Sequence, residues 1–185
     1  MDGQVKLIIL DRDGVINIER SDFVKTPDEF SPIPGSLEAI ALLNQHGYTV
    51  VIFTNQSGIS RGLFSEHDLT SVHNYMRSLL EEKGGAVDNI WFCPHHPSVV
   101  ECECRKPKTG MLLSIANFYN TSLTDVPVIG DKETDLIAAK SVKARPVLIS
   151  SDDKYQQETY RSLWDAVQHI IKTDAEKNIS TTGDG

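Results

Sequence analysis

Short apolar runs alternate along the chain with longer segments in which apolar residues recur at helical spacing. Short runs of this kind are typical of buried strands, and the longer segments are typical of amphipathic helices. Their alternation predicts an α/β protein with a parallel sheet and helices on both of its faces. The expected strands cover residues 6–10, 49–53, 90–92, 126–129 and 146–149.

The expected helices carry recognisable start and stop residues. Ser36 is the predicted N-cap of the first helix, and Gly47 is its predicted stop. A second helix begins at Ser65, where Asp68 completes a capping box, and ends near Gly84. Further helices are expected at residues 109–119, 133–143 and 160–172.

The length of 185 residues is enough for one domain with a substantial core. We predict a single domain over residues 1–172. Residues 173–185 are mostly polar and small, so they cannot bury enough apolar surface to order themselves. We expect them to form a flexible tail.

The composition limits the classes of partner. A net charge of −8 repels polyanions, which argues against nucleic acid as a principal partner. No apolar run approaches the roughly 20 residues that a membrane-spanning helix needs. The first residues lack the basic and long apolar regions of an export signal. We therefore expect a cytoplasmic monomer that binds neither nucleic acid nor a membrane.

Two carboxylates, Asp11 and Asp13, come directly after the first expected strand, and Gly14 follows them. Parallel sheets of this kind bind ligands beyond the carboxyl ends of their strands, so both side chains would lie in a site. The competing interpretation is an ordinary turn, because Asp and Gly are common turn residues.

Three further polar segments favour a site over a turn. Thr54 follows the second expected strand, Lys106 precedes a helix, and Asp131 and Asp135 follow the fourth strand. An aspartate pair, a Thr, a Lys and an acidic segment in this order resemble the motifs of the haloacid dehalogenase (HAD) superfamily. The resemblance implies a Rossmann-like HAD fold and phosphatase chemistry through an aspartyl-phosphate.

In that chemistry Asp11 is the implied nucleophile. A carboxylate and a phosphate repel each other by about 4 kcal/mol at ~4 Å and an effective dielectric constant of about 20, so a cation has to lie between them. Mg²⁺ suits this position because it prefers oxygen ligands. The ligands that the resemblance implies are Asp11, the backbone carbonyl of Asp13, and Asp131.

The remaining motif residues have implied roles in proton transfer and charge stabilisation. Asp13 is the implied acid and base, which protonates the leaving alcohol and then deprotonates water. Lys106 and the Thr54 hydroxyl would stabilise the phosphoryl group in the transition state. Asp135 is expected to support the metal site from outside or to pair with Lys106.

All three cysteines of the chain lie close together, within residues 93–104. Cys93, His95, Cys102 and Cys104 can form a tetrahedral zinc site of the three-cysteine, one-histidine type, although their spacing is tighter than in most zinc fingers. The alternative is a loop of reduced cysteines without metal. His96 is a spare side chain that could support the zinc ligands or the pocket.

The cysteine loop before Lys106 narrows the resemblance to the branch of heptose-bisphosphate and histidinol-phosphate phosphatases. It implies removal of the 7-phosphate from a heptose 1,7-bisphosphate, a step towards lipopolysaccharide core precursors. Histidinol-phosphate phosphatase and a catalytically silent zinc-binding scaffold are the alternatives. Only 40 residues separate Asp13 from Thr54, which leaves no room for an inserted cap domain.

Loops must therefore close the site, and their polar residues are candidates for contact with the phosphorylated sugar. Arg61 and Arg105 are the candidates for a second, non-reacting phosphate. Ordinary solvent-exposed loop residues are the competing interpretation. The full set of substrate-binding candidates is Glu19, Arg20, Ser21, Asp22, Asn55, Gln56, Ser57, Arg61, Arg105 and Lys132.

Overall fold

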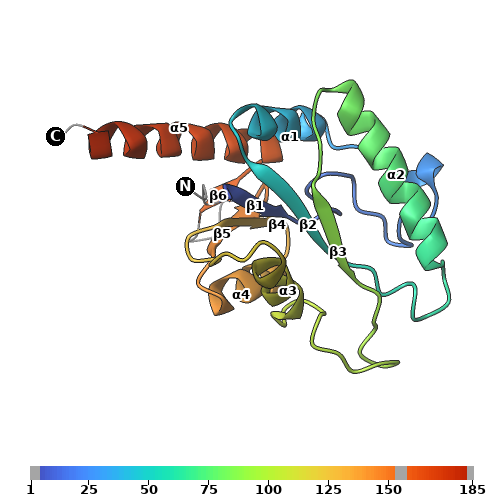
Figure 1. Cartoon of the computed structure of the whole chain (residues 1–185). Helices are drawn as coiled ribbons and strands as arrows, with labels where there is room; N and C mark the ends of the chain where they lie inside the picture. The colour runs from blue at the N-terminus through green and yellow to red at the C-terminus, as the bar shows by residue number, and fades with distance from the viewer. Residues whose placement is uncertain (1–4, 153–157, 183–185) are drawn as a thin grey trace.

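The computed structural model describes residues 5–152 and 158–182. Its centre is a six-stranded sheet in the order β3-β2-β1-β4-β5-β6, and every neighbouring pair is parallel (Figure 1). The strands are β1 (Leu7–Leu10), β2 (Thr49–Asn55), β3 (Asn89–Cys93), β4 (Pro127–Gly130), β5 (Arg145–Ile149) and β6 (Thr159–Tyr160). All five predicted strands are present, whereas β6 was not predicted.

Helices cover both faces of the sheet. On one face lie α1 (Ser36–Gln45), α2 (Glu66–Glu82) and α5 (Leu163–Thr182), and on the other lie α3 (Gly110–Phe118) and α4 (Glu133–Ser141). Successive strand residues point to opposite faces. In β1, Ile8 and Leu10 pack in the α1/α2/α5 core, and Leu7 and Ile9 pack in the α3/α4 core. The predicted α/β class with helices on both faces is confirmed.

The helix starts were predicted with mixed success. At α2 the capping box is present, because Ser65 Oγ accepts from the Asp68 amide and Asp68 accepts from the Ser65 amide. At α1 the N-cap is Gly35, not Ser36 as predicted. Ser36 is the first residue of the helix itself, and its buried hydroxyl donates to the carbonyl of Ile16 at 2.6 Å.

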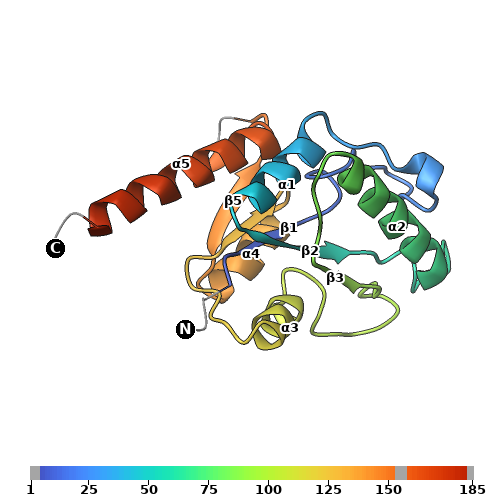
Figure 2. The same cartoon turned by 45° about the horizontal axis from the view of Figure 1, so that its top comes forward.

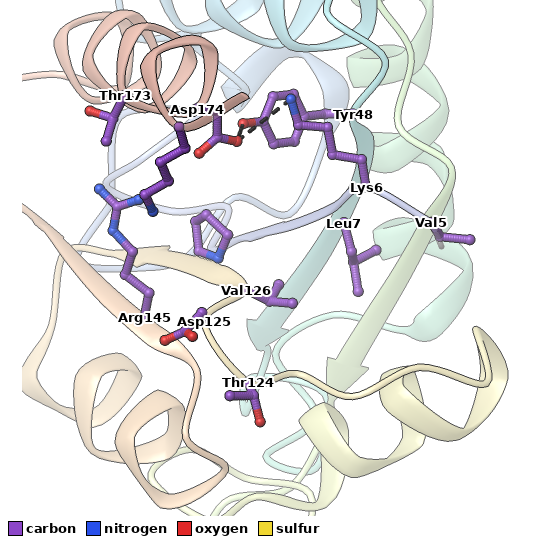
Figure 3. Close-up of a pocket in the computed structure, with 12 residues that line it drawn as sticks. Val5, Lys6, Leu7, Tyr48, Thr124, Asp125, Val126, Arg145, Thr173 and Asp174 are labelled. Carbon is purple, nitrogen blue, oxygen red and sulfur yellow. Dashed lines mark hydrogen bonds and ion pairs between the residues drawn. The ribbon is translucent and has the colours of Figure 1, made fainter. Parts of the chain in front are cut away.

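Helix α5 continues past Lys172, where we expected it to end, and runs to Thr182. The expected tail of residues 173–185 is therefore helical as far as Thr182, and residues 183–185 lie outside the described part of the chain. Asp174 accounts for part of this order, since it accepts from the Tyr48 hydroxyl and lies 3.5 Å from the Lys6 ammonium (Figure 3). Beyond these contacts α5 projects past the sheet (Figure 2).

The order in which strands are added to the sheet reverses between β1 and β4, and folds of this type bind ligands there, beyond the carboxyl ends of the strands. Residues 11–54, all of which are described, contain only the 3₁₀ turn η1 (Pro27–Glu29) and helix α1 before β2, which fits the expectation that no cap domain is inserted there. Within residues 5–152 and 158–182, no helix is long and apolar enough to cross a bilayer.

Candidate active site

Three carboxylates meet where β1 and β4 end. Asp11 follows β1, Asp131 lies in the turn after β4, and Asp135 lies in the first turn of α4. One carboxylate oxygen of each lies within 4.8 Å of the others. Gly14 makes this approach possible, because a Cβ there would lie 2.1 Å from the Asp131 carboxylate. The buried Asp131 Oδ1 has no hydrogen-bond partner, so the cluster presents acceptor oxygens without matching donors. This arrangement fits a divalent cation.

Burial, with the crowding of negative charge, shifts the protonation equilibria of these carboxylates. Burial raises the pKa of Asp11 to about 7, with Asp135, Asp13 and Asp131 adding to the rise and Lys106 opposing it. Burial also raises the pKa of Asp131 to about 6. A bound cation would keep both carboxylates ionised and would offset their negative charge.

Lys106 lies buried between two of the carboxylates. Its Nζ is 3.0 Å from Asp11 and 2.6 Å from Asp135, so the predicted pairing of Asp135 with Lys106 is present. These two carboxylates raise the pKa of Lys106, although burial opposes the rise. Asn55 fixes the backbone of Lys106 through two hydrogen bonds of 3.1 and 3.2 Å. The ammonium is therefore charged and held beside the candidate nucleophile.

Asp13 is surrounded by donors. Arg12 donates to both carboxylate oxygens at 2.9 Å, Asn17 Nδ2 donates at 2.9 Å and Gln56 Nε2 donates at 2.8 Å. Burial raises the pKa of Asp13, but the Arg12 charge and these hydrogen bonds outweigh it and lower the pKa below its usual value. Gln56 also donates to the Thr54 hydroxyl at 2.9 Å, which joins the two motif residues.

The four predicted zinc ligands meet in one cluster, with Cys93 Sγ, His95 Nδ1, Cys102 Sγ and Cys104 Sγ all within 4.8 Å of one another. Cys93 Sγ lies 3.7 Å from Cys102 Sγ and 3.1 Å from Cys104 Sγ, too far for a disulfide of about 2.05 Å. Zn–S bonds of about 2.3 Å in a tetrahedron separate sulfurs by roughly 3.8 Å, so the cluster could hold a metal ion.

His96 is not part of this cluster. Its ring Nδ1 lies 2.7 Å from the Ser98 hydroxyl, and its amide donates to Ser60 Oγ at 2.8 Å. It therefore joins the cysteine loop to the segment after β2. This contact fits the predicted supporting position and leaves His95 as the imidazole of the cluster.

The candidates for substrate binding fall into two groups. Glu19 and Lys132 form an ion pair at the edge of the carboxylate cluster, and Arg105 donates to the His95 carbonyl at 3.3 Å. Arg61 is exposed and stacks over the Phe23 ring at 5.0 Å. These side chains lie on loops that border the carboxyl edge of the sheet.

The side chains of the second group contact the catalytic candidates or their own loop. Arg20 pairs with Asp22 at 3.1 Å, and Gln56 is fully buried against Asp13. Asn55 binds the backbone of Lys106, and Ser57 is buried. These residues support the site. In the part of the chain that the structure describes, no hydrogen bond or ion pair holds the Ser21 side chain in the site.

Three residues of the site were missed by the sequence prediction, namely Arg12, Asn17 and His73. Arg12 is completely buried, which is unusual for Arg, and its Nη1 lies 3.1 Å from His73 Nε2 on α2. The pattern of α2 places His73 as a polar residue beside an apolar face, but it gives no sign of which residue His73 contacts. Only the tertiary structure brings it to the aspartate pair.

Residues 6–144 match the family described as polynucleotide kinase 3 phosphatase, and the chain belongs to this family. A HAD-superfamily hydrolase from Ehrlichia chaffeensis has the same fold, with a TM-score of 0.62, 17% identity and coverage of 91% of this chain and 97% of that one. The predicted HAD fold is thus confirmed.

Two relatives are much more similar. The D-glycero-beta-D-manno-heptose-1,7-bisphosphate 7-phosphatase of Pseudomonas putida is 49% identical over 147 residues, which cover 80% of this chain and 83% of that protein. The crystal structure of D,D-heptose 1,7-bisphosphate phosphatase from B. bronchiseptica, complexed with magnesium and phosphate, has a TM-score of 0.86 and 41% identity. It covers 91% of this chain and 99% of that one. The predicted resemblance to this branch is confirmed.

Proposed function

We propose that the protein is a Mg²⁺-dependent phosphatase that removes the 7-phosphate of D-glycero-D-manno-heptose 1,7-bisphosphate, a step towards the heptose of lipopolysaccharide core. The observation that carries the proposal is the position of Asp11, which lies beside a charged Lys106 and beside Asp131, a carboxylate with one buried oxygen that has no hydrogen-bond partner. Relatives with 49% and 41% identity are named for this substrate. No observation favours histidinol phosphate or a scaffold without activity.

The first half-reaction is an attack by Asp11 on phosphorus. A carboxylate oxygen forms the new P–O bond, the bond to the sugar oxygen breaks, and its electron pair stays on that oxygen, which takes a proton from Asp13. Mg²⁺ held by Asp11, Asp131 and the backbone carbonyl of Asp13 would supply the positive charge that lets two anions approach. Lys106 and Thr54 stabilise the transferring phosphoryl group.

The second half-reaction releases phosphate. Water attacks the phosphorus of the aspartyl-phosphate while Asp13, now a carboxylate, takes its proton, and the Asp11 carboxylate departs. The net reaction is phosphate ester plus water to alcohol plus inorganic phosphate. The proton that Asp13 takes in this step replaces the one that it gave to the sugar oxygen, and no other reactant is needed.

The cysteine cluster has a structural role in this proposal. Zn²⁺ bound by Cys93, His95, Cys102 and Cys104 would have no open position for a reacting water, as is typical of structural sites. Cys104 is followed by Arg105 and Lys106, so order in this loop determines where the catalytic ammonium lies. Arg105 and Arg61 are proposed to bind the 1-phosphate, which does not react.

A panel of phosphate esters tests the proposed substrate. The purified protein with Mg²⁺ should show its highest kcat/KM for the heptose bisphosphate and should yield the 1-phosphate as product. Histidinol phosphate and a 3′-phosphorylated oligonucleotide serve as comparisons, the latter because of the family description. A higher kcat/KM for either one would overturn the assignment.

A further inference from the structure

His73 and Arg12 form a buried polar pair next to the candidate acid and base. Arg12 is fully buried and His73 is 8% exposed, and they come from two successive βα units, since Arg12 follows β1 and His73 lies within α2. Buried arginines are rare, and a buried cation is costly unless its donors are satisfied. The pair therefore needs an explanation beyond core packing.

The hydrogen-bond chemistry fixes the direction of this contact. A guanidinium has donors and no acceptor, so His73 Nε2 must accept from Arg12 Nη1 across the 3.1 Å that separate them. Burial, with the Arg12 charge adding to it, lowers the pKa of His73 to about 3, so the ring is neutral and carries its proton on Nδ1. His73 thus presents a lone pair to Arg12.

Arg12 also donates hydrogen bonds to both aspartates. Its Nε and Nη2 donate to Asp13 at 3.3 and 2.9 Å, and its backbone amide donates to Asp11 Oδ1 at 2.7 Å. A fork with two donors fixes the orientation of a carboxylate, whereas a single point contact does not. The orientation of the Asp13 carboxylate accordingly depends on where the far end of Arg12 is held.

We propose that His73 is a positioning residue for acid–base catalysis, which acts through Arg12 to orient the Asp13 carboxylate. The inference rests on the proposed function, since Asp13 has to transfer a proton for its orientation to matter. Without the acceptor of His73, Arg12 Nη1 loses that partner in the buried site, and Arg12 shifts to find another. Asp13 then loses its alignment with the leaving oxygen.

A matched pair of variants separates this role from packing. In His73→Gln the Oε1 atom replaces Nε2 at the same number of bonds from the backbone and keeps the acceptor, whereas His73→Met has a similar length and ends in a methyl group. Met76→Ala is the control for packing, because Met76 is buried on α2 and belongs to the apolar core cluster. All three are measured as complete chains with zinc and Mg²⁺.

The readout is kcat/KM for two esters, the heptose bisphosphate with its alcohol leaving group and an aryl phosphate whose leaving group needs no proton. This constant includes steps up to departure of the leaving group, so hydrolysis of the aspartyl-phosphate does not contribute. Because misplacement by about 1 Å costs on the order of 100-fold and His73 acts indirectly, His73→Met should lose roughly 10-fold with the bisphosphate. With the aryl ester it should lose less than about 3-fold.

His73→Gln should restore the bisphosphate activity to within about 3-fold of the parent, and Met76→Ala should lower the melting temperature without changing the ratio between the two esters. Equal losses of His73→Met with both esters, or no rescue by Gln, would overturn the positioning role while the parent activity stands. If His73→Met does not fold, His73→Asn, whose acceptor is one bond too short, replaces it in the same comparison. A parent protein that cleaves neither ester refutes the proposed function and this inference together.

Discussion

Gly14→Ala tests the geometry of the carboxylate cluster with a single methyl group. Gly14 has φ of +80°, and an added Cβ would lie 2.1 Å from Asp131 Oδ2, whereas real Cβ contacts are essentially never shorter than 3.0 Å. The carboxylate of Asp131 must therefore move by about 0.9 Å or more. Displacements of about 1 Å in a catalytic site cost on the order of 100-fold in rate.

Two effects of the substitution can be separated. The left-handed backbone costs an alanine roughly 1–2 kcal/mol, which lowers the melting temperature of a chain of this size by about 2–8 °C. The clash adds a displaced metal ligand, and Mg²⁺ demands near-ideal octahedral geometry. We therefore expect about 100-fold lower kcat/KM, together with a higher Mg²⁺ concentration for half-maximal activity.

Gly47→Ala is the matched control. Gly47 has φ of +76°, and a Cβ there would meet no atom within 4 Å, so this variant carries the same backbone strain without the clash. Its melting temperature should fall by a similar amount, while its Mg²⁺ dependence and kcat/KM should equal those of the parent. Thermal unfolding and a Mg²⁺ titration of activity measure both variants. An unchanged Mg²⁺ titration in Gly14→Ala would refute the position given to Asp131.

Further predictions concern the nucleophile, the acid–base group, the second metal and pH. Asp11→Asn should abolish turnover without loss of folding, because the amide is nearly isosteric but cannot attack as an anion, and residual activity in a contamination-free preparation would remove Asp11 from that role. Asp13→Asn should lose roughly 10²- to 10⁴-fold with an alcohol leaving group, and an unchanged rate would contradict proton transfer by Asp13. Brief EDTA treatment should stop activity, added Mg²⁺ should restore it, and about one zinc per chain should remain throughout. Cys102→Ser should lower activity towards the bisphosphate more than towards an aryl phosphate. Freshly purified protein without zinc by metal analysis would contradict the structural site. In the metal-free protein burial raises the pKa of Asp11 from an ordinary 3.8 to about 7, so the folded state loses stability progressively as pH rises from about 4 to 7. Mg²⁺ should therefore raise the melting temperature more at pH 8 than at pH 5. An equal rise at both pH values would contradict this prediction.

Features that depend on local pattern could be predicted from the sequence. The apolar runs identify five strands because buried parallel strands are continuously apolar, and the capping box at Ser65 is formed by residues three positions apart. The aspartates and Thr54 could be placed in one site because parallel strands end at one edge of the sheet. The cysteine cluster followed from the proximity of its members along the chain.

Features that depend on tertiary contacts could not be predicted. Ser36 is a reasonable cap by residue type, but the helix begins at Ser36 itself, whose hydroxyl donates to a carbonyl twenty residues earlier. Helix α5 continues through Asp174, whose partners Tyr48 and Lys6 lie far away in sequence. The contact of His73 with Arg12 spans 61 positions and has no local signature. Single-domain organisation, the monomeric state and the cytoplasmic location stay predictions.

The central claim is that Asp11 takes the 7-phosphate covalently before water removes it. Rapid-quench experiments with heptose bisphosphate that carries radioactive phosphate at position 7 test it most directly, followed by digestion and identification of the labelled peptide. We expect acid-stable, base-labile label to appear within one turnover on the peptide that contains Asp11, and to be absent from Asp11→Asn. Release of labelled phosphate at full rate without labelled protein, or label on any other residue, would contradict the account.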